Sequence, residues 1–123
     1  VAKVAAEWWA NVIEHPEFDN GASDYASRMS SMLASMHTKP VSKDSKDKFI
    51  DTLCIKIEEM LGEHELVILS VDYTPCRALY DTAETAGIST LNFPWKTVMW
   101  IREKNIRVRY GYCADIETIY EKS

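Results

Sequence analysis

The spacing of apolar residues changes near residue 66, and this change constrains the fold more than any other feature of the sequence. Before it, apolar residues recur every three or four positions, which is the period of amphipathic helices. After it, short runs rich in β-branched and aromatic residues alternate with polar ones, as in half-buried strands. The length suits one compact domain, so we expect residues 1–123 to form a single α+β domain.

Three helices are expected in the first half of the chain. The first covers residues 2–14 and the second covers residues 24–37, each with one apolar stripe. The third begins after Ser42 or Ser45, since either hydroxyl can cap its first turn, and ends near Leu61. These helices supply one layer of the domain.

The second half predicts a strand over residues 66–71, a helix over 75–86, two strands over 97–102 and 106–112, and a last helix over 114–120. The expected fold is a small, mainly antiparallel sheet with a C-terminal β-hairpin, packed by the N-terminal helices and by one helix after the first strand. A three-stranded sheet leaves two open edges that a second copy could complete. We therefore expect a homo-oligomer, a dimer or higher.

The formal net charge of −5 hides an uneven distribution. Residues 95–112 hold five basic side chains against Glu103 alone, a local charge of +4 that leaves −9 for the rest. An acidic chain lacks the basic footprint that binds duplex nucleic acid or an anionic membrane. No apolar run approaches the ~20 residues that span a bilayer, and no signal peptide is visible. The odd cysteine count indicates reduced thiols in a cytosol-like compartment.

The expected hairpin brings the basic and aromatic side chains to one face, because side chains alternate along a strand. A two-residue turn at Lys104-Asn105 places Arg102 opposite Arg107 and Trp100 opposite Arg109. One face then carries Trp100, Arg102, Arg107 and Arg109. The other, core-facing side carries Met99, Ile101, Val108 and Tyr110.

A face of arginines around a tryptophan is unfavourable by itself, since like charges on opposite strands repel. The pattern favours a ligand whose anion is held by Arg107 and Arg109 and whose flat group stacks on Trp100. The alternative is a solvated hairpin whose arginines only keep the protein soluble.

Two further segments contain candidate ligand contacts. Arg77 lies in the first turn of an expected helix, where a cation is unfavourable unless it meets an anion. Its alternative role is an ion pair with Asp72 or Asp81. Asn92 and Phe93 supply an amide and an aromatic plane, the parts of a base-binding pocket. Their alternative role is a packed loop at the end of the sheet.

Catalytic and metal-binding patterns are missing. The three histidines lack the spacing of zinc or iron ligands. The glycine-rich phosphate loops and the nucleophile elbow of hydrolases do not occur either. We therefore expect a binding protein that is not an enzyme, with no catalytic residue, no metal and no cofactor.

Two stretches together carry a family resemblance: residues 8–21, from Trp8-Trp9 to Phe18-Asp19-Asn20-Gly21, and residues 71–112, with Asp72-Tyr73-Thr74-Pro75, Phe93-Pro94-Trp95-Lys96-Thr97 and Arg109-Tyr110-Gly111-Tyr112. The chain resembles small proteins encoded by phages and prophages of Gram-positive hosts. It is similar to the first Thoeris anti-defence family, the phage sponges that sequester cyclic ADP-ribose signals.

This resemblance implies an oligomer in the cytoplasm of the infected bacterial host that binds a nucleotide signal without degrading it. Related members also capture cyclic oligonucleotides. It implies Asn92 and Phe93 near the base, and Arg109 with Arg107 and Arg77 at phosphates. One alternative is a phage inhibitor of a host defence protein such as a nuclease, in which the acidic surface mimics nucleic acid. Another is a small enzyme of nucleotide metabolism.

Overall fold

The structure, a computed structural model, describes residues 1–14, 40–111 and 114–122. Within these ranges the order is α1 (Ala2–Glu14), α3 (Lys43–Glu63), β1 (Val67–Val71), α4 (Arg77–Ala86), the 3₁₀ helix η1 (Thr90–Asn92), β2 (Thr97–Ile101), β3 (Asn105–Arg109) and β4 (Ile116–Glu121). The fold is α+β, which confirms the expected class. The helix expected over residues 24–37 lies outside the described residues.

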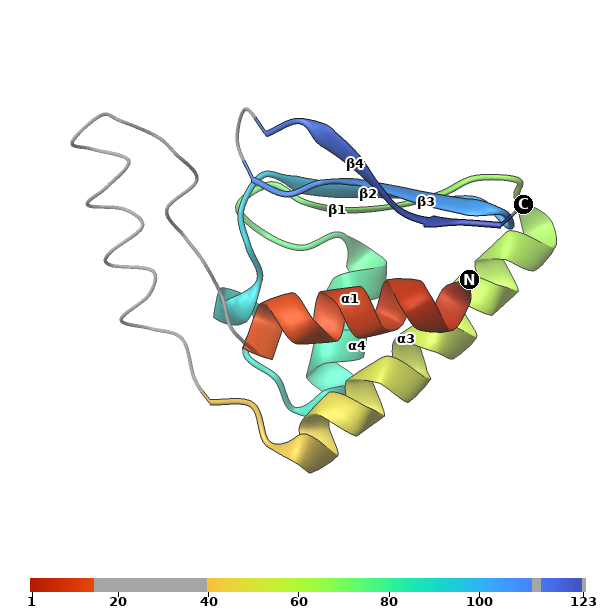
Figure 1. Cartoon of the computed structure of the whole chain (residues 1–123). Coiled ribbons are helices and arrows are strands. Elements are labelled where there is room, and N and C mark those ends of the chain that lie inside the picture. The colour runs from red at the N-terminus through yellow and green to blue at the C-terminus, as the bar shows by residue number, and fades with distance from the viewer. Residues whose placement is uncertain (15–39, 112–113, 123) are drawn as a thin grey trace.

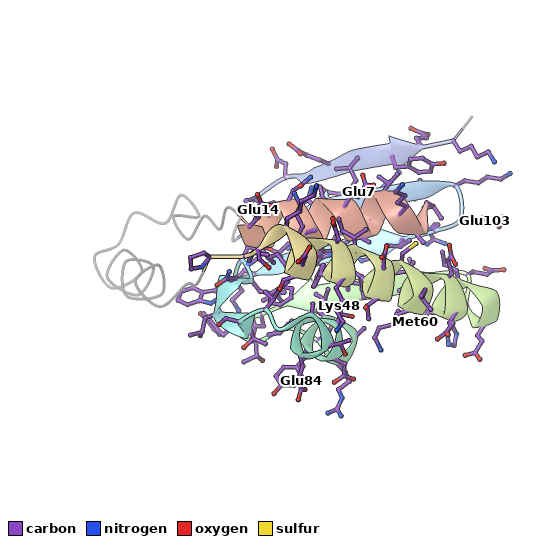
Figure 2. All side chains as sticks on the ribbon, turned by 90° about the horizontal axis from the view of Figure 1, so that it is seen from below. Glu7, Glu14, Lys48, Met60, Glu84 and Glu103 are labelled. Atoms are coloured by element: carbon purple, nitrogen blue, oxygen red, sulfur yellow. The ribbon has the colours of Figure 1, made fainter. Side chains whose placement is uncertain are left out.

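The described elements form two layers (Figure 1). The four strands make one antiparallel sheet in the order β1-β2-β3-β4, and the chain leaves the sheet between β1 and β2 to form α4 and η1. The three long helices of the described residues, α1, α3 and α4, lie against the same face of the sheet, and Figure 2 views the molecule from that side. No described helix covers the opposite face, which we call the outer face.

The core lies between the helices and the sheet. Helix α1 buries alanines together with Trp9 and Ile13, and α3 buries a stripe that repeats every fourth residue, Phe49, Leu53 and Ile57. The sheet meets them with the alternate side chains of β1, β2 and β3, Leu69, Met99, Ile101, Ile106 and Val108. Each large apolar side chain buried here stabilises the fold by roughly 1.5–3 kcal/mol.

The ends of two helices differ slightly from expectation. The Ser45 backbone N–H donates to the Ser42 hydroxyl at 3.1 Å, so Ser42 is the N-cap of α3. That helix runs on to Glu63, beyond the expected end at Leu61. Helix α4 begins at Arg77 rather than at residue 75, because residues 74–76 fold back along β1 and the Cys76 N–H donates to the Ser70 carbonyl at 2.8 Å.

The hairpin turn lies one residue earlier than predicted, at Glu103-Lys104, because the Arg102 N–H donates to the Asn105 carbonyl at 2.8 Å. The predicted pairing is therefore wrong by two residues: Trp100 lies opposite Arg107 and not Arg109. This register places two buried isoleucines opposite each other, Ile101 and Ile106. A shift of two residues keeps each side chain on its predicted face, so the division into a core side and an arginine side is confirmed for β2 and β3.

The last helix expected, over residues 114–120, is wrong, because this segment forms strand β4. The isoleucine, threonine and tyrosine side chains of β4 favour strands, and the backbone of β3 gains hydrogen-bonding partners along its second side. The fourth strand therefore comes from the same chain and covers an edge that a three-stranded sheet would leave open. β4 carries a bulge near its pairing with Ile106 and Arg107, a feature that discourages pairing with further strands.

Candidate functional site

The outer face of the sheet, which no described helix covers (Figure 1), carries three of the predicted site residues, Trp100, Arg107 and Arg109. Alternation along each strand and the observed register align the outward side chains in two rows across the four strands. The first row consists of Ile68, Trp100, Arg107 and Thr118. The second row consists of Ser70, Val98, Arg109 and Ile116.

Arg107 and Arg109 are both exposed on β3, on either side of the buried Val108. Within the described part of the chain, neither guanidinium forms an ion pair with a carboxylate. Two residues apart on one strand, these charges point to the same side, roughly 6.5–7 Å from each other along the strand. Their positive charge is thus available to an anion at the outer face.

Trp100 lies beside Arg107 and is half-buried. On its other side stands Ile68, whose exposed fraction is 51%. An indole in this place offers an aromatic plane to a flat ligand, and an arginine next to it offers charge to the same ligand.

A hollow of about 350 Å³ lies along the second row, from β1 across β2 to β3. Its lining combines both signs of charge with a hydroxyl: Ser70, Val71, Asp72, Lys96, Val98, Arg109 and Gly111. Gly111 has a φ of 94°, a conformation that suits glycine, and it brings no side chain into the space. The size lies at the lower end of the range typical of small-molecule sites.

Lys96 is held in the hollow by three contacts with the chain after β1. Its ammonium pairs with the Asp72 carboxylate and lies 4.7 Å from the centre of the Tyr73 ring. Its backbone N–H donates to the Asp72 carbonyl at 2.9 Å. Lys96 has a φ of 54°, which is strained for a residue other than glycine and costs on the order of 1–2 kcal/mol. Strain of this kind is concentrated at functional sites.

Three other predicted residues do not reach the outer face. Arg77 is exposed on α4, and its Nε atom pairs with Asp81 Oδ2 at 3.1 Å, which was one of its alternative roles. Asn92 is buried and donates from Nδ2 to the Ile13 carbonyl at 3.2 Å. Phe93 is buried against the rings of Trp9 and Phe49 on the helix side of the sheet. A ligand could contact Asn92 or Phe93 only if this packing opened.

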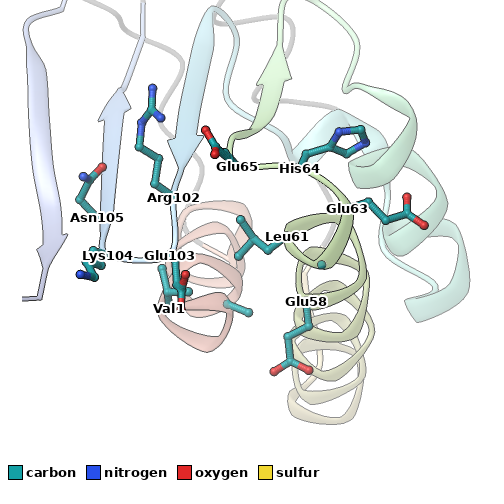
Figure 3. Close-up of a pocket in the computed structure, with 12 residues that line it drawn as sticks. Val1, Glu58, Leu61, Glu63, His64, Glu65, Arg102, Glu103, Lys104 and Asn105 are labelled. Atoms are coloured by element: carbon teal, nitrogen blue, oxygen red, sulfur yellow. The ribbon is translucent and has the colours of Figure 1, made fainter.

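A larger groove, of about 810 Å³, lies where the C-terminal end of α3 meets the hairpin turn (Figure 3). Its charged side chains have both signs, and Glu58, Glu63 and His64 point in different directions. Nothing in this arrangement converges on a common ligand. Within residues 1–14, 40–111 and 114–122, no group of His, Cys, Asp and Glu side chains is arranged to hold a metal ion.

The two described cysteines, Cys54 and Cys76, are free thiols, and Cys113 lies outside the described residues. Burial raises the pKa of the Cys54 thiol, and the neighbouring Glu58 carboxylate raises it further. The S–H group donates to Glu58 Oε1 at 3.7 Å, so Cys54 is held in its neutral, unreactive form. None of the described helices is long and apolar enough to cross a membrane.

Sequence reasoning missed Ser70, Asp72 and Lys96 as site residues. In the sequence, Asp72 is a possible partner for Arg77, and Lys96 is one of the five basic side chains of residues 95–112. The approach of Lys96 to Asp72 depends on how β1 and β2 pair and on a positive φ at a lysine, and neither can be deduced from residue type.

Comparison of the sequence with models of known protein families gives no match. Comparison with curated proteins gives no relative either.

Proposed function

We propose that the protein captures a cyclic nucleotide-type immune signal on the outer face of its sheet and holds it without cleaving it. The ligand class is cyclic ADP-ribose isomers or cyclic oligonucleotides. The observation that carries the proposal is the placement of Trp100 beside Arg107, with Arg109 in the next row and neither arginine paired with a carboxylate of the described residues.

In this proposal the base stacks on Trp100, and phosphate oxygens accept hydrogen bonds from Arg107 and Arg109. The two arginines would otherwise repel each other, and a bound phosphate removes this repulsion. A local charge of +4 in an acidic protein suits a small, discrete anion better than a long polyanion.

The lining side chains offer charge, hydrogen bonds and a stacking plane, and these features support the binding step of the proposal. The role as a phage anti-defence sponge, acting in the cytoplasm of the infected host, rests on the resemblance of residues 8–21 and 71–112 to that family. Such a protein acts stoichiometrically, and its effect depends on slow release of the signal.

Calorimetry with cyclic ADP-ribose isomers and with cyclic di- and trinucleotides tests the proposal. We expect binding of at least one of them, with recovery of the intact ligand after heat denaturation of the protein. Arg107→Ala and Arg109→Ala should each weaken binding by about tenfold or more. Arg102→Ala is the matched control, since Arg102 is an exposed arginine at the hairpin turn and lies outside the two rows.

If the wild-type protein binds none of these ligands, the proposal fails. An altered ligand after incubation would indicate an enzyme instead. Inhibition of a host protein that persists in the Arg107→Ala/Arg109→Ala double variant would indicate the protein-directed inhibitor.

A further inference from the structure

The hollow along the second row has two chemically different ends. Along the row, Ser70 on β1 and Arg109 on β3 lie on either side of Val98 on β2. Two strand spacings separate them, about 10 Å between Cα atoms. Asp72 follows β1 directly and therefore shares the Ser70 end of the hollow. One end thus offers hydrogen-bond acceptors, and the other offers a guanidinium.

Asp72 can accept hydrogen bonds although it is ion-paired. Its Oδ1 atom contacts the Lys96 ammonium, and its side chain is still 69% exposed. Solvent can therefore reach the carboxylate, and a ligand hydroxyl can reach it from the same side. An ionised carboxylate accepts hydrogen bonds only, so the groups that it recognises best are hydroxyls and other donors.

Lys96 makes an acidic residue compatible with an anion site. A bare carboxylate would repel a phosphate bound at Arg109. The Lys96 ammonium lies against the carboxylate and over the Tyr73 ring, so the Asp72 end of the hollow is close to neutral overall. Asp72 can then bind a hydroxyl while Arg109 binds the phosphate of the same ligand.

A phosphate at one end of a small ligand and neighbouring hydroxyls at the other are the features of a phosphorylated pentose. We propose that the hollow binds the ribose phosphate portion of the ligand, with Arg109 on the phosphate and Asp72 accepting from the ribose 2-hydroxyl. Val98 forms the apolar floor under the sugar ring, and Gly111 leaves the space for it. This inference rests on the proposed function and assigns a part of its ligand to a defined place.

The test compares ribose 5-phosphate with 2-deoxyribose 5-phosphate by NMR titration of the full chain. Wild-type protein should bind ribose 5-phosphate about tenfold more tightly, because the deoxy sugar leaves the Asp72 carboxylate without its donor. In Asp72→Ala, which removes the acceptor oxygens, this ratio should fall toward one, even if the loss of a negative charge strengthens the binding of both sugars. Arg109→Ala should weaken both by about tenfold or more.

Asp81→Ala is the matched control, since Asp81 is also paired with a basic residue but lies on α4. It should leave the ratio unchanged. Equal binding of the two sugars by the wild-type protein overturns the inference without reference to any variant. A ratio that survives in a folded Asp72→Ala protein overturns it as well.

The inference and the proposed function can fail separately. Trp100→Ala should weaken the binding of cyclic nucleotides and leave that of ribose 5-phosphate unchanged, because the base alone contacts the indole. Asp72-dependent sugar binding without any cyclic nucleotide binding would support the ribose phosphate site in the hollow and contradict the proposed capture of a cyclic nucleotide. Cyclic nucleotide binding that needs Trp100 but not Asp72 would support the proposed capture of a cyclic nucleotide and contradict the ribose phosphate site in the hollow.

Discussion

Trp100 and Arg107 lie opposite each other on β2 and β3, on the face of the sheet that no described helix covers. This cross-strand pair joins an aromatic plane to a cation that has no carboxylate partner in the described chain. Cross-strand neighbours lie about 4.5–5.5 Å apart, so one small ligand can contact both. The pair is therefore the centre of the proposed binding surface.

Trp100→Ala should weaken the binding of the cyclic nucleotide by about tenfold to a hundredfold, because stacking on an aromatic side chain contributes roughly 1–3 kcal/mol per base. Titration calorimetry measures the change. Tyr80→Ala is the control, since Tyr80 is an exposed aromatic residue on α4, away from the outer face. Equal affinities of the Trp100→Ala and wild-type proteins would exclude stacking at this position.

Asn92→Ala should destabilise the fold. Its buried amide donates to the Ile13 carbonyl, and removal leaves that carbonyl without this donor, at a cost of about 1–3 kcal/mol in the free energy of unfolding. Urea denaturation measures this quantity. Asn11→Ala is the matched control on the exposed side of α1 and should be neutral or slightly stabilising. Lost ligand affinity at full stability in Asn92→Ala would instead support its direct contact with the base.

Gly87→Ala and Gly62→Ala should have opposite effects on stability. Gly87 ends α4 with a φ of 72°, so a side chain there costs about 1 kcal/mol although no atom lies within 4 Å of the added carbon. Gly62 lies within α3 and also has open space around it, so alanine should stabilise the helix by up to ~1 kcal/mol. Thermal unfolding of the two variants checks the sign, and equal effects would contradict the helix-end geometry.

The Cys54 thiol should react slowly with alkylating reagents near neutral pH, because burial and Glu58 raise its pKa and keep it protonated. Glu58→Gln removes one of these causes and should increase the alkylation rate, as measured by mass spectrometry of the Cys54 peptide. Because the pKa is raised in the folded state, the thiol's contribution to stability is complete at lower pH. It is lost as the pH rises through the folded-state pKa, and Cys54→Ala should remove this alkaline dependence. An unchanged rate in Glu58→Gln would contradict the assigned role of the carboxylate.

The protein should form a homo-oligomer, with a mass in light scattering at least twice the 14.1 kDa of one chain. The outer face exposes apolar side chains, and Ile116 in its second row has an exposed fraction of 51%. Ile116→Lys should therefore weaken association. Ile55→Lys is the control on α3, where the isoleucine is similarly exposed. A constant mass of one chain over a wide concentration range would exclude the oligomer.

Local patterns in the sequence predicted much of the fold. The helical stripe of α3, the alternation along β2 and β3, and the strand at β1 depend on which side chains must leave water, and this is encoded in their spacing. The separation of Trp100, Arg107 and Arg109 from the core followed for the same reason. A register error of two residues did not affect it, because the side-chain period of a strand is two.

Within residues 1–14 and 40–111, the sequence by itself determined which segments are helical or extended, and which hairpin side chains face solvent. Only the tertiary structure decided that residues 116–121 form a strand. A short segment adopts the conformation in which its backbone N–H and C=O groups form hydrogen bonds, and here the neighbouring strand β3 supplies the partners. Tertiary packing also buried Asn92 and Phe93, and it brought Lys96 to Asp72 across 24 residues of chain. These contacts join distant parts of the chain, so no local pattern encodes them.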